Sequence, residues 1–141
     1  MMKTTLTIAA FALATAASAQ QNPLWLRHCA ISPDGSTVAF TYKGDIYTVP
    51  AEGGNARQLT TNPAYDSHPV WSPDSKQLAF CSNREGSMDI YLMQREGGTP
   101  QRLTTNSGNE RPIAFKDNKT VLYYTSIMPT AQSIIFANGS L

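Results

Sequence analysis

Charge is scarce in this 141-residue sequence: only 15% of the side chains are charged, with 11 Lys and Arg against 10 Asp and Glu. Without a basic excess, the composition is not suited to holding nucleic acid or an anionic membrane surface. The shortage of charge does not indicate disorder, because apolar residues make up 41% of the chain. Nine Gly and nine Pro indicate many turns. We therefore expect a turn-dense, all-β domain with no nucleic-acid partner.

Long hydrophobic runs are also rare, and the one that stands out extends from about Leu6 to Ala17. It follows Lys3 and ends in Ala17-Ser18-Ala19, a pattern typical of a secretory signal peptide cut before Gln20. The run is shorter than the roughly 20 apolar residues of a membrane anchor, so no membrane insertion is expected. Residues 1–19 are therefore predicted to direct export, making the protein periplasmic or secreted.

Cysteine occurs only twice, as Cys29 and Cys81. In an oxidising compartment the two thiols could form a disulfide. Both also lie in apolar strand context, where a thiol serves as a small buried hydrophobe. Buried thiols and a disulfide are the two alternatives.

What the sequence does contain is an internal repeat. Residues 32–40, Ser-Pro-Asp-Gly-Ser-Thr-Val-Ala-Phe, return 40 positions later at 72–80 as Ser-Pro-Asp-Ser-Lys-Gln-Leu-Ala-Phe. Residues 44–47 and 52–62 return at a spacing of 44. The four-residue difference falls between Phe80 and Asp89, and we expect it to lengthen one loop and leave the strands unchanged.

A third copy is eroded. Residues 112–123 align with 69–80 at a spacing of 43, and Ile134-Ile135-Phe136 align with Ile90-Tyr91-Leu92 at 44. The signature Trp71-Ser72-Pro73 has become Ala114-Phe115-Lys116. The repeat is therefore expected to continue, with weaker sequence support, into the last third of the chain.

Each copy is predicted to form four short antiparallel strands. The strand at 37–42, and its copy at 77–81, is almost continuously apolar or β-branched, so both faces should be covered. Four strands per 40 to 44 residues are typical of propeller blades. We predict an all-β, incomplete β-propeller over residues 20–141: two full four-stranded blades (about 27–62 and 67–106) and about three strands of a third (110–141).

These motifs carry a family resemblance. Trp-Ser-Pro-Asp, Asp-Ile-Tyr, Glu-Gly-Gly and Arg-Leu-Thr, in that order, resemble the WD-like β-propeller repeat of TolB, of the tricorn proteases and of some prolyl-peptidase relatives. The opening Pro23-Leu24-Trp25-Leu26-Arg27, followed by residues 30–35, 42–47 and 63–66, is similar to the start of an exported tricorn-like serine peptidase. The resemblance implies a longer polypeptide, in which propellers precede a catalytic domain with a serine nucleophile.

Catalytic signals are absent from the sequence itself. There is no Gly-x-Ser-x-Gly elbow, and His28 and His68 occupy equivalent repeat positions rather than distinct roles. We expect no catalytic residues, no cofactor and no metal. The favoured interpretation places both imidazoles at the wet axial channel; the alternative is that they converge on a metal or an acidic ligand.

The best candidates for recognition are the loops that join one blade to the next, at 61–69 and 105–112. Together they carry aromatic, cationic and anionic groups suited to a peptide or protein partner. The candidate binding residues are Tyr65, Asp66, His68, Asn109, Glu110 and Arg111. The alternative is that these are ordinary solvated loops.

Two functions are compatible with this sequence. In the first, a non-catalytic propeller segment begins an exported tricorn-like serine peptidase, and binds and gates peptides for a serine site encoded downstream. In the second, a TolB-like periplasmic propeller binds another protein and never catalyses. In both, the remaining blades or a downstream catalytic domain are expected as partners.

Overall fold

The computed structural model describes residues 25–127 and 133–138, which form strands and turns with no helix. Within these ranges there is accordingly no helix long and apolar enough to cross a membrane. The predicted signal peptide lies outside the described residues. The strands are β1 (Arg27–Ile31), β2 (Thr37–Tyr42), β3 (Asp45–Pro50), β4 (Arg57–Gln58), β5 (Asp66–Trp71), β6 (Gln77–Glu85), β7 (Ser87–Gln94), β8 (Gly97–Arg102), β9 (Glu110–Asp117), β10 (Thr120–Thr125) and β11 (Ser133–Asn138).

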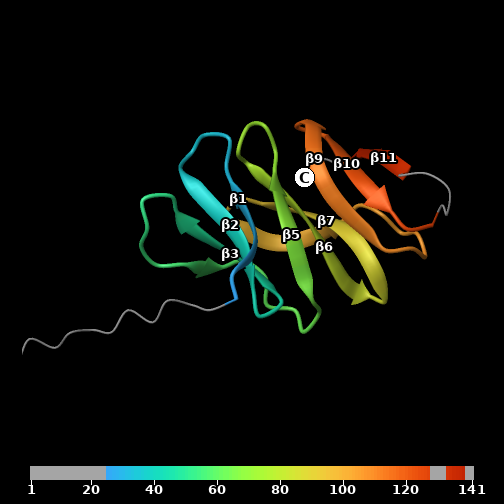
Figure 1. Ribbon diagram of the computed structural model, residues 1–141, viewed down its shortest axis with the longest axis horizontal. Coiled ribbons are helices and arrows are strands. Elements are labelled where there is room, and N and C mark those ends of the chain that lie inside the picture. The colour runs from blue at the N-terminus through green and yellow to red at the C-terminus, as the bar shows by residue number, and fades with distance from the viewer. Residues whose placement is uncertain (1–24, 128–132, 139–141) are drawn as a thin grey trace, which may run out of the picture.

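The strands form three antiparallel sheets that follow one another along the chain. Blade 1 is β1-β2-β3-β4, blade 2 is β5-β6-β7-β8, and the partial blade 3 is β9-β10-β11. The innermost strand of each later blade packs on the blade before it: β5 contacts β1, β2 and β3, and β9 contacts β5, β6 and β7. Figure 1 shows the three sheets side by side in chain order. The predicted fold class, two four-stranded blades and three strands of a third, is confirmed.

The strand register confirms the repeat alignment. Phe40 lies opposite Tyr47 in blade 1, and Phe80 lies opposite Tyr91 in blade 2. In the eroded third copy Tyr123 lies opposite Ile135. The same pairing therefore recurs at the positions that the spacing predicts.

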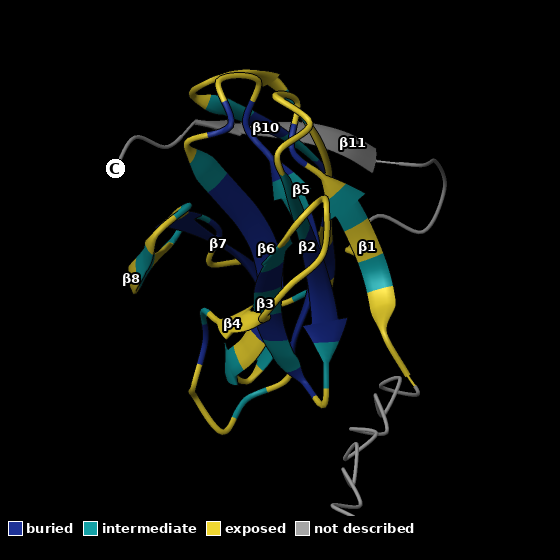
Figure 2. Ribbon diagram, turned by 90° about the vertical axis from the view of Figure 1, so that its left-hand side faces the viewer, coloured by how far each residue is buried: buried dark blue, intermediate teal, exposed yellow. Residues whose placement is uncertain are grey.

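Blade 2 is apolar on both faces. Alternate residues of a strand point to opposite sides of the sheet, and in β6 both sets include apolar residues. Leu78 and Phe80 belong to the core between blades 1 and 2, whereas Ala79 belongs to the core between blades 2 and 3. Figure 2 shows β6 buried over most of its length and β4 exposed at the outer edge of blade 1. We call the two blade interfaces seam 1–2 and seam 2–3.

The four-residue insertion does not lengthen a loop, so that expectation was wrong. β6 has nine residues where β2 has six, and Glu85 still pairs with Ser87 across a turn at Gly86. The inserted residues continue the ladder because pairing satisfies their backbone N–H and C=O groups. The insertion therefore projects as a strand extension beside the start of β5.

The two cysteines are free thiols. Cys81 is buried, as one alternative predicted, but Cys29 is exposed. The expectation that both thiols are buried is therefore wrong for Cys29, which lies on the edge strand β1, where no earlier blade covers it within the described residues.

Successive blades are joined at the tips of their first turns. The Asp34 N–H donates to Ser75 Oγ (3.0 Å) across seam 1–2, and the Asp74 N–H donates to Asn118 Oδ1 (3.1 Å) across seam 2–3. In addition, Trp71 Nε1 donates to the Ala30 carbonyl oxygen (3.0 Å). Ser75 in blade 2 and Asn118 in blade 3 thus each bind the turn of the preceding blade.

Candidate functional site

A hollow of about 590 Å³ opens at seam 2–3, at the ends of the blades opposite the bonded turn tips. We call it the seam 2–3 hollow. Five of the six candidate residues line it; they come from the two connections between blades and from the strands that follow them, β5 and β9. The lining residues are Tyr65, Ser67, His68, Cys81, Met88, Asn109, Glu110, Arg111 and Tyr124.

The sixth candidate, Asp66, does not line the hollow. It is fully buried, and Arg84 binds both of its carboxylate oxygens at 3.1 Å. The Arg84 guanidinium also lies 4.4 Å from the ring centroid of Tyr91. Arg84 comes from the inserted segment, as does Asn83, whose Oδ1 accepts the Tyr65 N–H at 2.7 Å. The insertion therefore shapes the candidate loop and gives Asp66 a structural role.

One wall of the hollow carries Ser67, His68 and Cys81. The Cys81 thiol donates to the Ser67 carbonyl oxygen at 3.3 Å, and its sulfur lies 3.6 Å from His68 Nδ1. Burial raises the pKa of the Cys81 thiol. Burial, with the charges of His28 and Arg111, lowers the pKa of His68 to about 4. At neutral pH the pair is thus a thiol and a neutral imidazole, which lacks the thiolate that nucleophilic chemistry needs.

The two histidines stack on each other at seam 1–2. Their ring centroids are 3.6 Å apart with an interplanar angle of 29°. Both have positive φ, 52° at His28 and 54° at His68, at matching irregularities of β1 and β5. Burial lowers the pKa of both imidazoles, and the nearby charge of Arg111 adds to this effect. In register Arg111 takes the place of Ser67, since Arg111 pairs with Tyr124 as Ser67 pairs with Cys81. The described residues contain no group of three or more side chains able to hold a metal ion.

Glu110 is the buried acid of the hollow, with only 2% of its surface exposed. Asn106 Nδ2 donates to its Oε1 at 2.8 Å. Its Oε2 is buried and has no hydrogen-bond partner. The carboxylate therefore retains an unused acceptor, which is itself buried.

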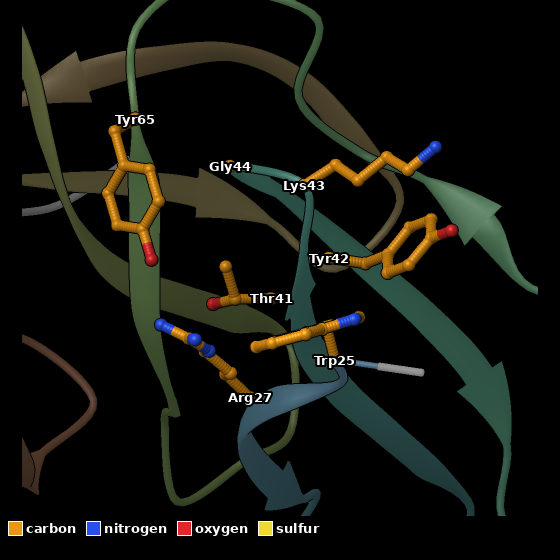
Figure 3. A pocket seen from close by; sticks show the side chains of 7 residues that line it. All are labelled: Trp25, Arg27, Thr41, Tyr42, Lys43, Gly44 and Tyr65. Carbon is orange, nitrogen blue, oxygen red and sulfur yellow. The ribbon is translucent and has the colours of Figure 1, made fainter. Parts of the chain in front are cut away.

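A smaller hollow of about 300 Å³ lies at the same end of seam 1–2 and shares Tyr65. Figure 3 shows Tyr65, Thr41 and Arg27 turned toward one side of it, and Tyr42 and Lys43 toward the other. The Tyr65 ring closes the space over Gly44, where an added Cβ would lie 3.3 Å from it. We call this the seam 1–2 hollow.

Four lining residues of the seam 2–3 hollow were not predicted: Ser67, Cys81, Met88 and Tyr124. The repeat held a usable signal for the last, because Tyr124 follows Cys81 at the spacing of 43 seen between the second and third copies. Two residues at the same strand position of adjacent blades lie at the same depth of the stack. Alignment of the third copy would therefore have placed Tyr124 beside the loop residues.

Repeated four-stranded antiparallel sheets stacked on their faces define the class: this is a segment of a WD-like β-propeller. The family follows from the sequence match, since residues 23–136 match the tricorn protease N-terminal beta propeller domain. The chain belongs to this family.

Relatives agree with this assignment. The chain is 36% identical over 57 residues to tricorn protease homolog 1 of Streptomyces coelicolor, covering 40% of this chain and 5% of that protein. It is 35% identical over 69 residues to dipeptidyl-peptidase 5 of Porphyromonas gingivalis, covering 42% and 10%.

Among solved structures, a TolB-type protein of Agrobacterium tumefaciens has a TM-score of 0.62 and 31% identity, over 77% of this chain and 41% of that chain. The chain thus spans a tenth or less of the two peptidases and less than half of the TolB-type structure.

Proposed function

We propose that this chain is the non-catalytic propeller segment of an exported tricorn-like serine peptidase, in which it binds peptides and gates their passage to a serine site carried elsewhere in the protein. The observation that carries the proposal is the convergence of five rim-loop side chains on the seam 2–3 hollow. A hollow with tyrosines and a methionine around buried polar groups suits an extended peptide. The family and its peptidase relatives support the same function.

Peptide binding is tested on the full chain by fluorescence anisotropy with fluorescein-labelled decapeptides. Tyr65→Ala and Tyr124→Ala remove the two tyrosines of the hollow, which are 42% and 40% exposed, so both variants should fold normally. We expect each to weaken binding about tenfold, as a central aromatic contact does. Ile31→Ala is the matched control, because Ile31 is an exposed apolar side chain outside the hollow. Equal affinities in all four proteins would refute binding at this hollow.

A TolB-like periplasmic propeller that binds a protein and never catalyses is the second candidate. It is favoured by the TolB-type structure, which is 31% identical over 77% of this chain. A serine-reactive fluorophosphonate probe separates the two functions in cells that express the gene. Labelling of a product much heavier than 15.4 kDa, detected with an antibody to this chain, supports the peptidase. An unlabelled product supports the TolB-like function.

Export is tested on the same cells. We propose that residues 1–19 are removed, so the protein in the periplasmic or secreted fraction should begin at Gln20. Amino-terminal sequencing gives the answer directly. Recovery of the intact amino terminus in the cytoplasmic fraction would contradict the proposal.

A further inference from the structure

Arg27 lies on the face of blade 1 that packs against blade 2. It pairs with Thr41 across β1 and β2, and the side chains of a directly opposed pair point to the same face of a sheet. Thr41 is two positions from Ala39, which belongs to the core of seam 1–2, so the two share that face. Arg27 and Thr41 both line the seam 1–2 hollow. The Arg27 guanidinium therefore lies at the rim end of this seam.

Tyr65, from the connection before β5, lines the same hollow and is held there by its backbone. The Tyr65 N–H donates to Asn83 Oδ1, and the next N–H, that of Asp66, donates to the Gly44 carbonyl oxygen, both at 2.7 Å. The ring lies over Gly44 of blade 1 and is 42% exposed. Figure 3 shows Tyr65 and Arg27 turned toward the same side of the hollow. The scaffold thus sets the position of the phenol before a ligand binds, which lowers the cost of ordering it.

This side of the hollow carries hydrogen-bond donors without acceptors. Within the described residues the Arg27 guanidinium is in no ion pair and no hydrogen bond; its carbon lies 5.7 Å from the ring centroid of Trp25. The Tyr65 hydroxyl likewise has no hydrogen-bond partner in the described part of the chain. No acidic side chain lines the hollow. Both donors are therefore available to an anion.

The acids next to Gly44 and Tyr65 in the sequence are bound elsewhere. The Asp66 carboxylate is held by Arg84. The Asp45 carboxylate accepts hydrogen bonds from Gln58 at 3.0 Å and Thr60 at 3.2 Å. Neither carboxylate neutralises Arg27.

The second cation of the hollow, Lys43, lies on its other side. Its Nζ is 5.4 Å from the ring centroid of Tyr42, which follows Thr41 in β2 and so points to the opposite face of blade 1. Figure 3 shows Tyr42 and Lys43 turned away from Tyr65. The positive charge on the Tyr65 side of the hollow is therefore that of Arg27.

We propose that the seam 1–2 hollow binds a carboxylate of a peptide, with the Arg27 guanidinium as its ion-pair partner and the Tyr65 hydroxyl as a second donor. The two oxygens of a carboxylate match the paired N–H donors of a guanidinium. A peptide offers such a group at its carboxyl terminus or on an acidic side chain. The inference rests on the proposed peptide-binding function: Tyr65 lines both hollows, so a peptide in the seam 2–3 hollow lies next to this one.

Three pentapeptides with an uncharged BODIPY label at the amino terminus test the inference on the full chain by fluorescence anisotropy. The first is pentaalanine with a free carboxyl terminus, the second is its terminal amide, and the third is the amide with a central glutamate. We expect a carboxylate peptide to bind about tenfold more tightly than the neutral amide, as a charge-assisted hydrogen bond allows. Tighter binding of the first identifies a terminal carboxylate, and tighter binding of the third identifies an acidic side chain.

Three variants locate the effect. Arg27→Gln should abolish the preference, because it removes the charge of the ion pair. Tyr65→Phe keeps the ring and removes only the hydroxyl, so it should reduce the preference about threefold. Arg57→Gln is the matched control, since it makes the same substitution at an exposed position of β4 that does not line the hollow, and it should keep the preference.

Equal binding of the three pentapeptides by the unaltered chain would overturn the inference, as would a preference that Arg27→Gln leaves unchanged or that Arg57→Gln also removes. If Arg27→Gln fails to fold by circular dichroism, Tyr65→Phe decides in its place. Equal binding that Tyr65→Ala still weakens would leave the proposed peptide binding intact and refute only the carboxylate preference. Absence of binding by the pentapeptides and by the decapeptides would refute both.

Discussion

Seam 1–2 and seam 2–3 are built from the same repeat, but they differ in the bonding of the buried acid at the rim and in the size of the hollow there. At seam 1–2 the buried acid Asp66 has its arginine, and the hollow at the rim is about 300 Å³. At seam 2–3 Glu110 has no arginine, and the hollow is about 590 Å³. In register, Glu110 takes the place of Asp66, because Glu110 pairs with Thr125 as Asp66 pairs with Ser82. The acid is thus kept in the third copy, whereas its arginine is not.

The contrast shows that rim side chains can change between copies of a repeat while the scaffold is kept. The strand pairing and the bonds between turn tips are kept in both seams. What differs is whether the buried carboxylate at the rim of the seam has an arginine partner in the described part of the chain. Seam 1–2 pairs its buried acid with an arginine, whereas seam 2–3 leaves Glu110 Oε2 without a hydrogen-bond partner.

The largest expected effect comes from removing the core of seam 1–2. Phe80 is fully buried there, so Phe80→Ala should lower the free energy of unfolding by about 3–5 kcal/mol. Val121→Ala, in the core of seam 2–3, should cost only about 2 kcal/mol, because it removes fewer carbon atoms. Urea unfolding followed by tryptophan fluorescence measures both. A larger loss for Val121→Ala would contradict this ranking.

Arg84→Ala would remove the ion-pair partner of Asp66, the buried acid of seam 1–2. Removing one partner of a buried ion pair leaves Asp66 without its cation and should cost about 3 kcal/mol in the same unfolding assay. Adding Asp66→Asn should restore part of the loss, since no buried charge is then left unpaired. If the double variant is no more stable than Arg84→Ala, the ion pair is not the cause.

The stacked imidazoles predict a pH dependence of stability. The pKa of His68 is lowered to about 4 in the folded chain, below its ordinary value of 6.5. The unfolded chain therefore binds the extra proton first, and stability that is present above pH 6.5 is lost as the pH falls toward 4, by up to about 2 kcal/mol. His68→Asn, which also tolerates positive φ, should show a flatter profile over this window. Parallel profiles for the two proteins would contradict the assignment to His68.

The smallest effect is expected from the polar clamp on the other rim of seam 1–2. Arg95 of blade 2 donates to Ser36 Oγ at 2.7 Å and to Thr37 Oγ1 at 2.6 Å in blade 1. These bonds are partly solvated, so Arg95→Ala should cost about 1 kcal/mol. Lys76→Ala, an exposed cation with no such contact across the seam among the described bonds, is the control for the change of charge. Equal effects of the two variants would show that the contacts of Arg95 across the seam do not add to the stability of the fold.

The fold was predictable because several copies of the repeat indicate the same order of strands and turns. Each copy carries its own turn residues and its own apolar strand, so agreement between copies fixes the architecture. The four-residue insertion was misjudged because a single sequence gives its position but not its hydrogen bonding: Ser82 to Glu85 lack the apolar alternation of a strand. Pairing with β7 outweighed local preference.

The candidate site was predictable only in part, for a related reason. Loop position alone brought together Tyr65, Asp66 and the residues before β9, since all lie where one blade joins the next. It could not indicate that Asp66 meets Arg84, because the two are 18 positions apart and their contact depends on the strand extension. Nor could it identify Glu110 as unpaired, which depends on which cations reach the seam.

The bonds between turn tips have a mechanical consequence. Ser75 and Asn118 fasten the blades at one rim, while both hollows lie at the other. Hydrogen bonds also join the blades at the rim with the hollows, where the Asp66 N–H donates to the Gly44 carbonyl oxygen (2.7 Å) and the Met88 N–H donates to Asn109 Oδ1 (3.1 Å). Neighbouring blades are therefore held at both rims, and the width of each hollow is set by the scaffold itself.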